Sequence, residues 1–323
     1  MKVMDVIQLL EKEGTWIRSD FKTRDHLLHG SEDAQIHTVG VCWVATTQAI
    51  QEAARHKADM IITHENPFYQ CSTQMHTAAY EAAKSKRRLL DQYGISVYRC
   101  HDVWDCIRTY GVADQWAALL GFPFEQRPQA SYYQAADIPE MRLEDLARHT
   151  CHVLHGDHED GVYVFGNTDM HIRRIAIGTG AATDLYELLP LHPDAVIVSD
   201  DGITSYDAAQ YALDHGIGMV VVNHAAVERA GLKAMVPWLQ ERMKDAEAVW
   251  LHDGFHIHYY MNKVGCCPDG SEQDHDTEFS QSSGKNSGWQ KHQESHAVSK
   301  RCSNTDHGAG YKRNERMRYS SYR

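Results

Sequence analysis

Long apolar runs are missing from this 323-residue sequence, although 42% of its residues are apolar. A membrane-spanning helix needs about 20 such residues in succession, and a secretory leader needs an apolar block followed by small residues. The first residues instead form an amphipathic helical pattern, with apolar side chains at positions 6, 7, 9 and 10. We therefore predict a cytoplasmic protein with no membrane partner.

Familiar cysteine and catalytic motifs are missing as well. The eight cysteines include no C-x-x-C pair, and five are scattered through the apolar part of the chain: Cys42, Cys71, Cys100, Cys106 and Cys151. Reduced and mostly buried thiols are the expectation. The sequence has no G-x-S-x-G, P-loop or H-E-x-x-H pattern, which excludes the hydrolases, nucleotidases and proteases that use them.

Positive charge is scarce. The formal net charge is −12, and no basic stripe interleaved with aromatic residues occurs before residue 261. A nucleic-acid partner is therefore not expected. Histidine, in contrast, is abundant at 22 residues. Because histidine is the commonest metal ligand, the composition hints at metal chemistry.

Apolar runs alternate with helical stretches up to about residue 260. Such alternation indicates β-α-β units and mainly parallel sheets, whose buried strands read as continuous apolar runs. A helix, a buried strand and a histidine follow one another once in each half of the chain. We predict an α/β fold of two similar α/β lobes facing a shared site, with chance repetition as the alternative. The expected strands are 39–44, 60–63, 95–100, 162–165, 172–177, 195–199 and 219–222, and the expected helices are 48–57, 77–93, 113–120, 142–152, 183–189, 206–215 and 225–244.

The chain divides by composition into three parts. Residues 1–125 are predicted to form the first α/β lobe, and residues 126–260 a second part that completes the site. Residues 261–323 are polar, with almost no aliphatic side chains. They bury too little apolar surface to offset the entropy of ordering, so we expect disorder. This segment is either a non-native extension or a functional tail, and its composition does not distinguish the two.

Two His–Glu combinations follow predicted strands. His64 and Glu65 come directly after strand 60–63, and the carboxyl ends of strands are where open α/β sheets form sites. His224 and Glu228 lie four residues apart near the start of a predicted helix and therefore share a face. These ligand types suit Zn, Mn or Fe, and a carboxylate can bridge two ions. Strand-end hydrogen bonding and an exposed helical glutamate are the alternatives.

A third polar group, His101, Asp102 and Asp105, follows strand 95–100. Its alternatives are a helix N-cap for Asp102 and a solvated loop position for Asp105. Three such groups at three strand ends favour one shared site over coincidence.

Two further turns are less specific. Gly178-Thr179-Gly180 precedes a predicted helix and would permit a phosphate loop, but it lacks a third glycine. The segment 199–202, Ser-Asp-Asp-Gly, is either a plain turn or part of the same cleft.

These motifs, in this order, resemble the GTP cyclohydrolase 1 type 2 family, the dinuclear-metal-centre hexameric proteins. The resemblance covers residues 1 to about 260. It rests on the opening helix, Gly40-Val-Cys-Trp-Val-Ala-Thr-Thr, Ala58-Asp59-Met-Ile-Ile-Thr-His64, His101-x-x-x-Asp105, Gly178-Thr-Gly180-Ala and Asn223-His224-x-x-x-Glu228.

The resemblance implies two divalent metal ions, Zn, Mn, Fe or Mg, on five residues: His64, Glu65, Asp105, His224 and Glu228. The family has a second histidine where this chain has Glu65, which makes the site harder and favours Mn, Fe or Mg over Zn. A Tyr-His pair of the family appears here as Tyr206-Asp207, a departure at the expected substrate pocket.

The resemblance also implies a toroidal homohexamer and a GTP ring-opening hydrolysis in which a metal-bound hydroxide attacks a purine carbon. We expect a metal-dependent hydrolase of a nucleotide or related small molecule. Glu65 and His101 are the candidate catalytic residues, with His101 either relaying protons or supporting the ligands. The alternative is a non-catalytic metal-binding or partner-binding ring, in which the ions stabilise fold and assembly.

Overall fold

The computed structural model describes residues 1–17, 21–69 and 76–260. They belong to one compact unit, Met1–Asn262. The expected disorder of residues 261–323 lies outside the described residues, as does the prediction for Cys71.

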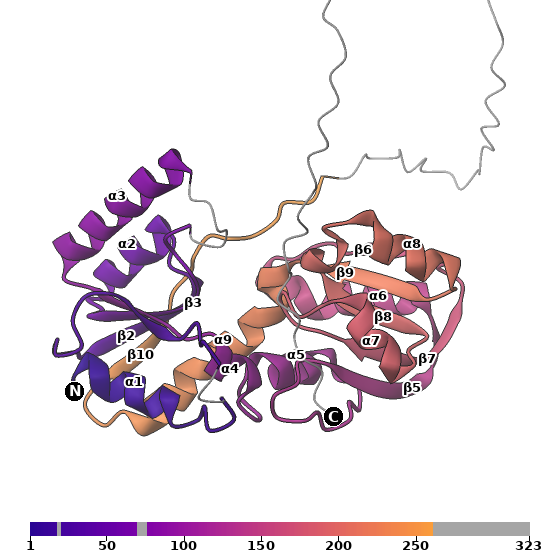
Figure 1. The fold of residues 1–323 in the computed structure, drawn as a ribbon, viewed down its shortest axis with the longest axis horizontal. Helices are drawn as coiled ribbons and strands as arrows, with labels where there is room; N and C mark the ends of the chain where they lie inside the picture. The colour runs from indigo at the N-terminus through magenta and orange to yellow at the C-terminus, as the bar shows by residue number, and fades with distance from the viewer. Residues whose placement is uncertain (18–20, 70–75, 261–323) are drawn as a thin grey trace, which may run out of the picture. The chain divides into compact units, whose positions relative to one another are not determined.

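The first of two five-stranded sheets is mainly parallel (Figure 1). Strands β4, β3, β2 and β10 run parallel to one another, and β1 pairs antiparallel with β4 at one edge. In spatial order the strands are β1 (His26–His29), β4 (Ser96–Arg99), β3 (Met60–Glu65), β2 (Thr38–Val44) and β10 (Glu247–Trp250).

Helices cover both faces of the first sheet. Successive side chains of a strand point to opposite faces, so each strand contributes to two cores. Val39 and Val41 pack against α1 (Val3–Glu11) and α9 (His224–Arg242). Cys42 lies in the core that is formed with α2 (Thr47–Arg55) and α3 (Thr77–Tyr93). Figure 1 shows α2 and α3 on one side of the sheet and α1 on the other.

The second sheet also has parallel inner strands, but both of its edge strands are antiparallel to their neighbours. Its inner strands β7, β8 and β9 are parallel, while β5 and β6 are antiparallel to their neighbours. One face packs on α5 (Val112–Leu120) and α6 (Leu143–Leu154), and the other on α7 (Leu185–Leu188) and α8 (Tyr206–Asp214). The spatial order is β5 (Gln134–Arg142), β7 (His171–Ile177), β8 (Ala195–Ser199), β9 (Gly218–Val222) and β6 (Tyr163–Phe165).

Helices α5 and α9 connect the two lobes. The first residues of α9 face the second core through Ala226 and Val227, while Leu232 and Trp238 further along face the first core. The two helices approach closely at Gly231, where an added Cβ would lie 2.5 Å from the Cα atom of Val112. Glycine permits this contact because it has no side chain.

The predicted fold class is confirmed: two sheets of mostly parallel strands form two α/β lobes. The helix–strand–histidine unit occurs in each, as α2–β3–His64 and as α8–β9–His224. One detail differs, because β3 continues through Glu65, which pairs with Val44 of β2. His64 and Glu65 are thus the last residues of the strand itself.

Strands β1, β5 and β10 were not predicted, and all three lie at sheet edges. These edge strands are partly solvated, so they lack the continuous apolar run that marks a buried strand. Since β10 returns to the first sheet, residues assigned to the second part by sequence also complete the first lobe. The division at 125/126 otherwise remains a proposal.

In the part of the chain that the structure describes, no helix combines the length and apolarity that crossing a membrane requires.

Candidate metal centre

The five residues predicted as ligands come together at the carboxyl end of β3. His64 and Glu65 end that strand, Asp105 lies in the short helix α4 (Asp102–Cys106), and His224 and Glu228 lie in the first turns of α9. The chain brings them there because β3 and β4 are parallel neighbours, so their carboxyl ends meet at one edge of the sheet.

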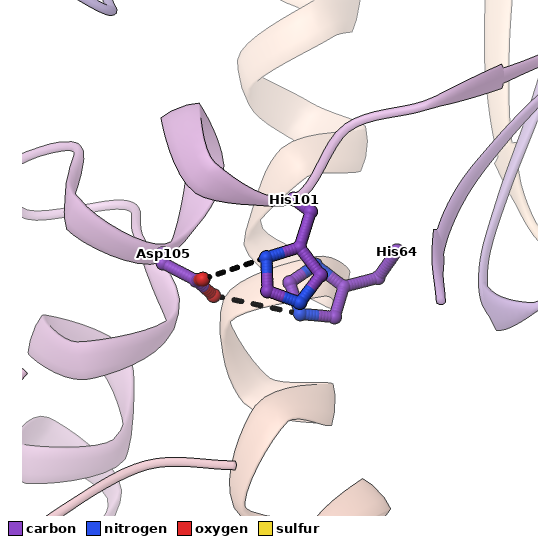
Figure 2. A group of neighbouring side chains, drawn as sticks. All are labelled: His64, His101 and Asp105. Carbon is purple, nitrogen blue, oxygen red and sulfur yellow. Dashed lines mark ion pairs between the residues drawn. The ribbon is translucent and has the colours of Figure 1, made fainter. Parts of the chain in front are cut away.

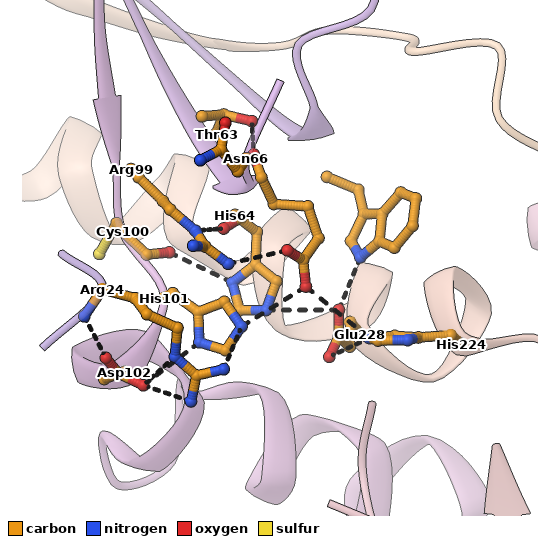
Figure 3. A network of polar contacts seen from close by, with 12 residues as sticks. Arg24, Thr63, His64, Asn66, Arg99, Cys100, His101, Asp102, His224 and Glu228 are labelled. Carbon is orange, nitrogen blue, oxygen red and sulfur yellow. Dashed lines mark hydrogen bonds and ion pairs between the residues drawn. The ribbon is translucent and has the colours of Figure 1, made fainter. Parts of the chain in front are cut away.

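Glu228 lies between two histidines (Figure 3). Its Oε2 atom is 3.3 Å from Nε2 of His64, and its Oε1 atom is 3.0 Å from Nε2 of His224. The indole N–H of Trp43 also donates to Oε2, at 2.6 Å. The side chain is buried. Burial alone would raise the pKa of Glu228, but the neighbouring His224 and His64 hold it well below its usual range.

His64 is oriented as a metal ligand would be. Its Nδ1 lies 3.2 Å from the backbone carbonyl of Cys100, to which only a protonated Nδ1 can donate. That hydrogen bond leaves the lone pair on Nε2. Nε2 faces Asp105 Oδ1 at 3.4 Å and Glu228 at 3.3 Å. It is buried and makes no hydrogen bond of acceptable geometry within the described structure.

His101 joins the same group (Figure 2). Its ring stacks on that of His64 with centroids 4.3 Å apart, and its Nδ1 lies 3.0 Å from Asp105 Oδ2. This buried Nδ1 likewise makes no acceptable hydrogen bond among the described residues. His64, His101 and Asp105 therefore form a set of three that can hold an ion, whereas the sequence suggested only a catalytic or supporting role for His101.

His224 is held by a pair of aspartates that follow β8. Asp200 Oδ1 accepts the backbone N–H of His224 at 2.8 Å, and the Asp201 carboxylate contacts Nδ1. An Asp–His contact of this kind directs the other ring nitrogen, Nε2, toward Glu228. Of the two interpretations of segment 199–202, participation in the cleft is the one this geometry favours.

Each carboxylate oxygen of Glu65 contacts a basic side chain. Its Oε2 accepts from Nη2 of Arg99 at 2.8 Å, and its Oε1 lies 3.4 Å from Nε2 of His101 and 3.9 Å from Nε2 of His224. Burial would raise the pKa of Glu65, but the hydrogen bond with His101 and the nearby imidazoles lower it to about 2. The carboxylate is thus ionised at neutral pH.

The carboxylates favour protonated imidazoles when no metal is present. Burial would lower the pKa of His224, but Glu228 and Asp201 outweigh it and raise the pKa to about 11. Burial also opposes the charge on His101, yet Asp105, Asp102 and Glu65 raise its pKa well above the usual range. A metal ion would therefore displace these protons from the imidazole nitrogens when it binds.

These observations fit a metal. The buried Nε2 of His64 and Nδ1 of His101 lack hydrogen bonds and lie beside carboxylate oxygens. On the far side of the ring, Nδ1 of His64 contacts a backbone carbonyl and Nδ1 of His224 contacts Asp201. A second set of three, His64, Glu65 and Glu228, overlaps the first at His64. Imidazole and carboxylate ligands together suit Zn, Mn or Fe.

Sequence reasoning missed several supporting residues: Arg24, Trp43 and Arg99. Arg24 pairs with Asp102 at 2.7 Å. Because Asp102 is buried beside His101, this pair fixes the segment that carries His101 and Asp105. No periodicity or spacing indicated these partners, since each comes from a different strand or loop.

The glycine turn after β7 has a steric role at the centre. A Cβ at Gly180 would overlap Glu228 Oε1 and lie 2.8 Å from His224 Nε2. The backbone at Gly180 also has φ +51°, which favours glycine. The phosphate-loop hypothesis for this turn remains a prediction. Tyr206, which with Asp207 stands where the family resemblance implies a Tyr-His pair, is 80% exposed at the start of α8.

The family is shown by comparison with known sequences. Residues 1–253 match the profile of Duf34/NIF3 (NGG1p interacting factor 3). The chain belongs to this family, of which the GTP cyclohydrolase 1 type 2 group is part. The resemblance found in the sequence is thereby confirmed. No curated protein matches the chain.

Solved structures share the fold. The protein ybgI, described as of unknown function, aligns with TM-score 0.64 and 22% identity over 77% of this chain and 97% of its own. Staphylococcus aureus SA1388 aligns with TM-score 0.65 and 16% identity, covering 81% and 99%. Reduced HcgD from Methanocaldococcus jannaschii aligns with TM-score 0.60 and 18% identity, covering 78% and 98%. At these identities the likeness concerns the fold alone.

Proposed function

We propose that this chain binds two divalent metal ions and uses them to hydrolyse a nucleotide or a related small molecule. The position of Glu228 carries the proposal. Its two carboxylate oxygens face different histidines, His64 at 3.3 Å and His224 at 3.0 Å. A carboxylate in this position is suited to bridge two ions.

We assign the five ligands to two ions from their pairwise contacts. One ion would take His64, Asp105 and Oε2 of Glu228, with His101 beside them. The other would take His224, Glu65 and Oε1 of Glu228. Two ions would also compensate the negative charge of the site, since three of these ligands are carboxylates. With two dications bound, the buried negative charge is offset.

The pair of ions would supply an activated water and polarise a substrate oxygen. The chain's own residues decide where a substrate enters. His64, Asp105 and Glu228 have side-chain exposures of at most 5%, whereas Glu65 and His224 are 24% and 20% exposed. A substrate therefore approaches at the Glu65–His224 end. Glu65 and His101, 3.4 Å apart, are placed to exchange a proton there.

The alternative function is a non-catalytic metal-binding ring. Its support is the origin of the ligands: Glu65 and Asp105 come from the first lobe, while His224 follows β9 of the second. Ions held by both would stabilise the fold whether or not they react. The same residues serve both functions, so only turnover separates them.

The first test is metal content. Elemental analysis of the purified protein should give two ions per chain, and at most one in Glu228→Ala. Glu241→Ala, an exposed position on the same helix, is the matched control and should retain two. A wild type that holds no ion after incubation with Zn²⁺, Mn²⁺ or Fe²⁺ would overturn the proposal.

The second test is turnover. Wild type, loaded with metal, should hydrolyse GTP or another nucleotide, and His224→Ala should lose that activity while keeping its oligomeric state. Absence of turnover on every nucleotide tested, with two ions bound, would contradict the hydrolase and favour the non-catalytic ring.

We also propose a cytoplasmic homohexamer, following the family resemblance. Light scattering should then give about six times the chain mass of 36.7 kDa. A monomer or dimer at micromolar concentration would contradict the hexamer without affecting the metal centre.

A further inference from the structure

Residues 252–260, which follow β10, form a connection between the two lobes that we call the strap. It begins at the first sheet, where Leu251 donates its backbone N–H to the Val41 carbonyl at 2.8 Å. Figure 1 shows this orange segment leaving the first sheet and running toward the second lobe. Among the described residues, no backbone group of the strap pairs with another backbone group. Contacts that involve side chains therefore hold it in place.

The first lobe holds the strap beside the candidate metal centre. The Thr46 hydroxyl donates to the backbone carbonyl of Asp253 at 2.6 Å. Phe255 packs on Trp43 with ring centroids 4.6 Å apart. The indole N–H of Trp43 in turn donates to Glu228. The strap thus reaches a proposed metal ligand through one intervening side chain.

The second lobe holds the other end of the strap, over a group of buried charges. The Tyr259 hydroxyl donates to the buried carboxylate of Glu159 at 2.9 Å. Arg229 of α9 lies 3.9 Å from Oε1 of Glu159 and 3.9 Å from Oδ1 of Asp253, too far for direct hydrogen bonds. Oε1 of Glu159 and Oδ2 of Asp253 are buried and make no hydrogen bond within the described structure. Because water could reach these oxygens when the strap lifts, opening costs less than it would over a fully paired group.

Some part of the chain must move before an ion can reach the buried ligands. His64, Asp105 and Glu228 have side-chain exposures of at most 5%. Strand β3 and helix α9, which carry two of them, are held by the hydrogen bonds of a sheet and of a long helix. The strap has no such backbone pairing, and segments of this kind open locally at low free energy. Of these three parts, the strap opens most readily.

We propose that the strap is a gate over the metal centre, which opens at its Tyr259 anchor and lets divalent ions exchange with the buried ligands. When the strap lifts, Phe255 leaves Trp43, and Trp43 can then turn away from Glu228. The gating role rests on the proposed metal centre, whereas the opening of the strap does not.

Opening is tested on the metal-free, full-length protein by limited digestion with chymotrypsin. Cleavage after Phe255, identified from the product masses, requires the strap to leave the surface, so its rate follows the population of the open form. Tyr259→Phe removes one hydrogen bond to a carboxylate and should raise this rate about tenfold. The control, Tyr260→Phe, changes the neighbouring side chain, which is 95% exposed, and should be cleaved as wild type is. Equal rates in the two variants would overturn the Tyr259 anchor.

Gating is tested by the rates of Zn²⁺ loading and of Zn²⁺ removal by a chelator. Both rates should rise about tenfold in Tyr259→Phe with the affinity unchanged, because a gate speeds entry and exit equally. Phe255→Ala, which releases Trp43 without touching the second lobe, should act in the same direction. Faster removal with weakened affinity would show that Tyr259 supports the ligands, and would overturn the gate.

Two other outcomes separate the gate from the proposed function. Faster cleavage of Tyr259→Phe with unchanged Zn²⁺ exchange would overturn the gating role and leave the metal centre intact. A wild type that binds no ion would overturn the metal centre and the gating role together, while the cleavage rates would still decide whether Tyr259 anchors the strap.

Discussion

At the residue scale, Glu65 is a proposed ligand whose carboxylate pairs with Arg99. Arg99 donates from Nη2 to Glu65 at 2.8 Å and from Nε to the His64 carbonyl at 3.0 Å. Both side chains are mostly buried, at 24% and 11% exposed. Arg99 therefore leaves one oxygen of Glu65, Oε1, facing the other imidazoles.

This pair should be energetically coupled. Glu65→Gln and Arg99→Met should each destabilise the metal-free protein, because removal of one partner leaves a mostly buried charge unpaired. The double variant should be less destabilised than the sum, with a coupling of about 1–3 kcal/mol. Urea unfolding with a chelator present measures the cycle. Additive effects would show that the pair contributes nothing beyond its separate side chains.

Metal binding should release protons from the imidazoles. His224, with a pKa raised to about 11, and His101, also raised, carry protons at neutral pH without metal, and only neutral imidazole binds a metal. Metal affinity should therefore rise with pH toward pH 9, about tenfold per unit for each proton released.

Titration calorimetry at pH 7.5 in two buffers of different ionisation enthalpy counts these protons. His224→Gln should release one proton fewer than wild type. Binding enthalpies that do not depend on the buffer would contradict the raised pKa values.

At the element scale, the turn between β7 and α7 sets how closely the backbone approaches the proposed metal ligands of α9, His224 and Glu228. Glu228 and His224 project from the first turns of α9 toward this turn, and Gly180 is the point of contact. The Ser199 hydroxyl donates to the Gly180 carbonyl at 2.6 Å. This contact ties the turn to the end of β8, so the turn cannot easily move away.

Gly180→Ala should therefore lower metal affinity by displacing Glu228. Part of any effect comes from backbone strain at positive φ, which costs about 1–2 kcal/mol for a residue with a Cβ. Gly216→Ala separates the two causes, because Gly216 has φ +66° but open space around it. Both variants should lose stability, and only Gly180→Ala should lose bound metal in elemental analysis. Full occupancy in Gly180→Ala would show that Glu228 tolerates the methyl group.

At the scale of the whole molecule, the centre joins elements that are distant in sequence. His64 and Asp105 belong to the first lobe, and α9, which carries Glu228, packs into both cores. An ion that binds the folded protein and not the unfolded chain stabilises it by about 4 kcal/mol at a thousandfold excess over its Kd.

Removal of the metal should accordingly lower the thermal unfolding midpoint of the entire Met1–Asn262 unit in one transition. Differential scanning calorimetry with and without a chelator measures this change. Glu228→Ala, which lacks the carboxylate proposed to hold both ions, should respond less than wild type. An equal response in both proteins would mean that Glu228 does not hold the metal.

Much of the fold was predictable because the inner strands are buried on both faces. β2, β3, β8 and β9 read as continuous apolar runs between helices, and these define the two sheets. β1, β5 and β10 were not predicted because polar side chains interrupt or flank their apolar residues, whereas the edge strand β6 is an apolar run and was predicted. The return of β10 to β2 depends on a contact between residues about 200 positions apart, which no local pattern records.

For the candidate metal centre, too, part was predictable from the sequence and part was not. The sequence by itself identified three groups of ligand-type residues at strand and helix ends, because short spacings and strand polarity are local properties. The family resemblance implied which five of them are ligands: His64, Glu65, Asp105, His224 and Glu228. Only the tertiary structure decided that Glu228 lies between two histidines, that His101 joins the group, and which partners orient the rings. Those facts depend on distances between separate elements, and they exist only once both lobes are folded around α9.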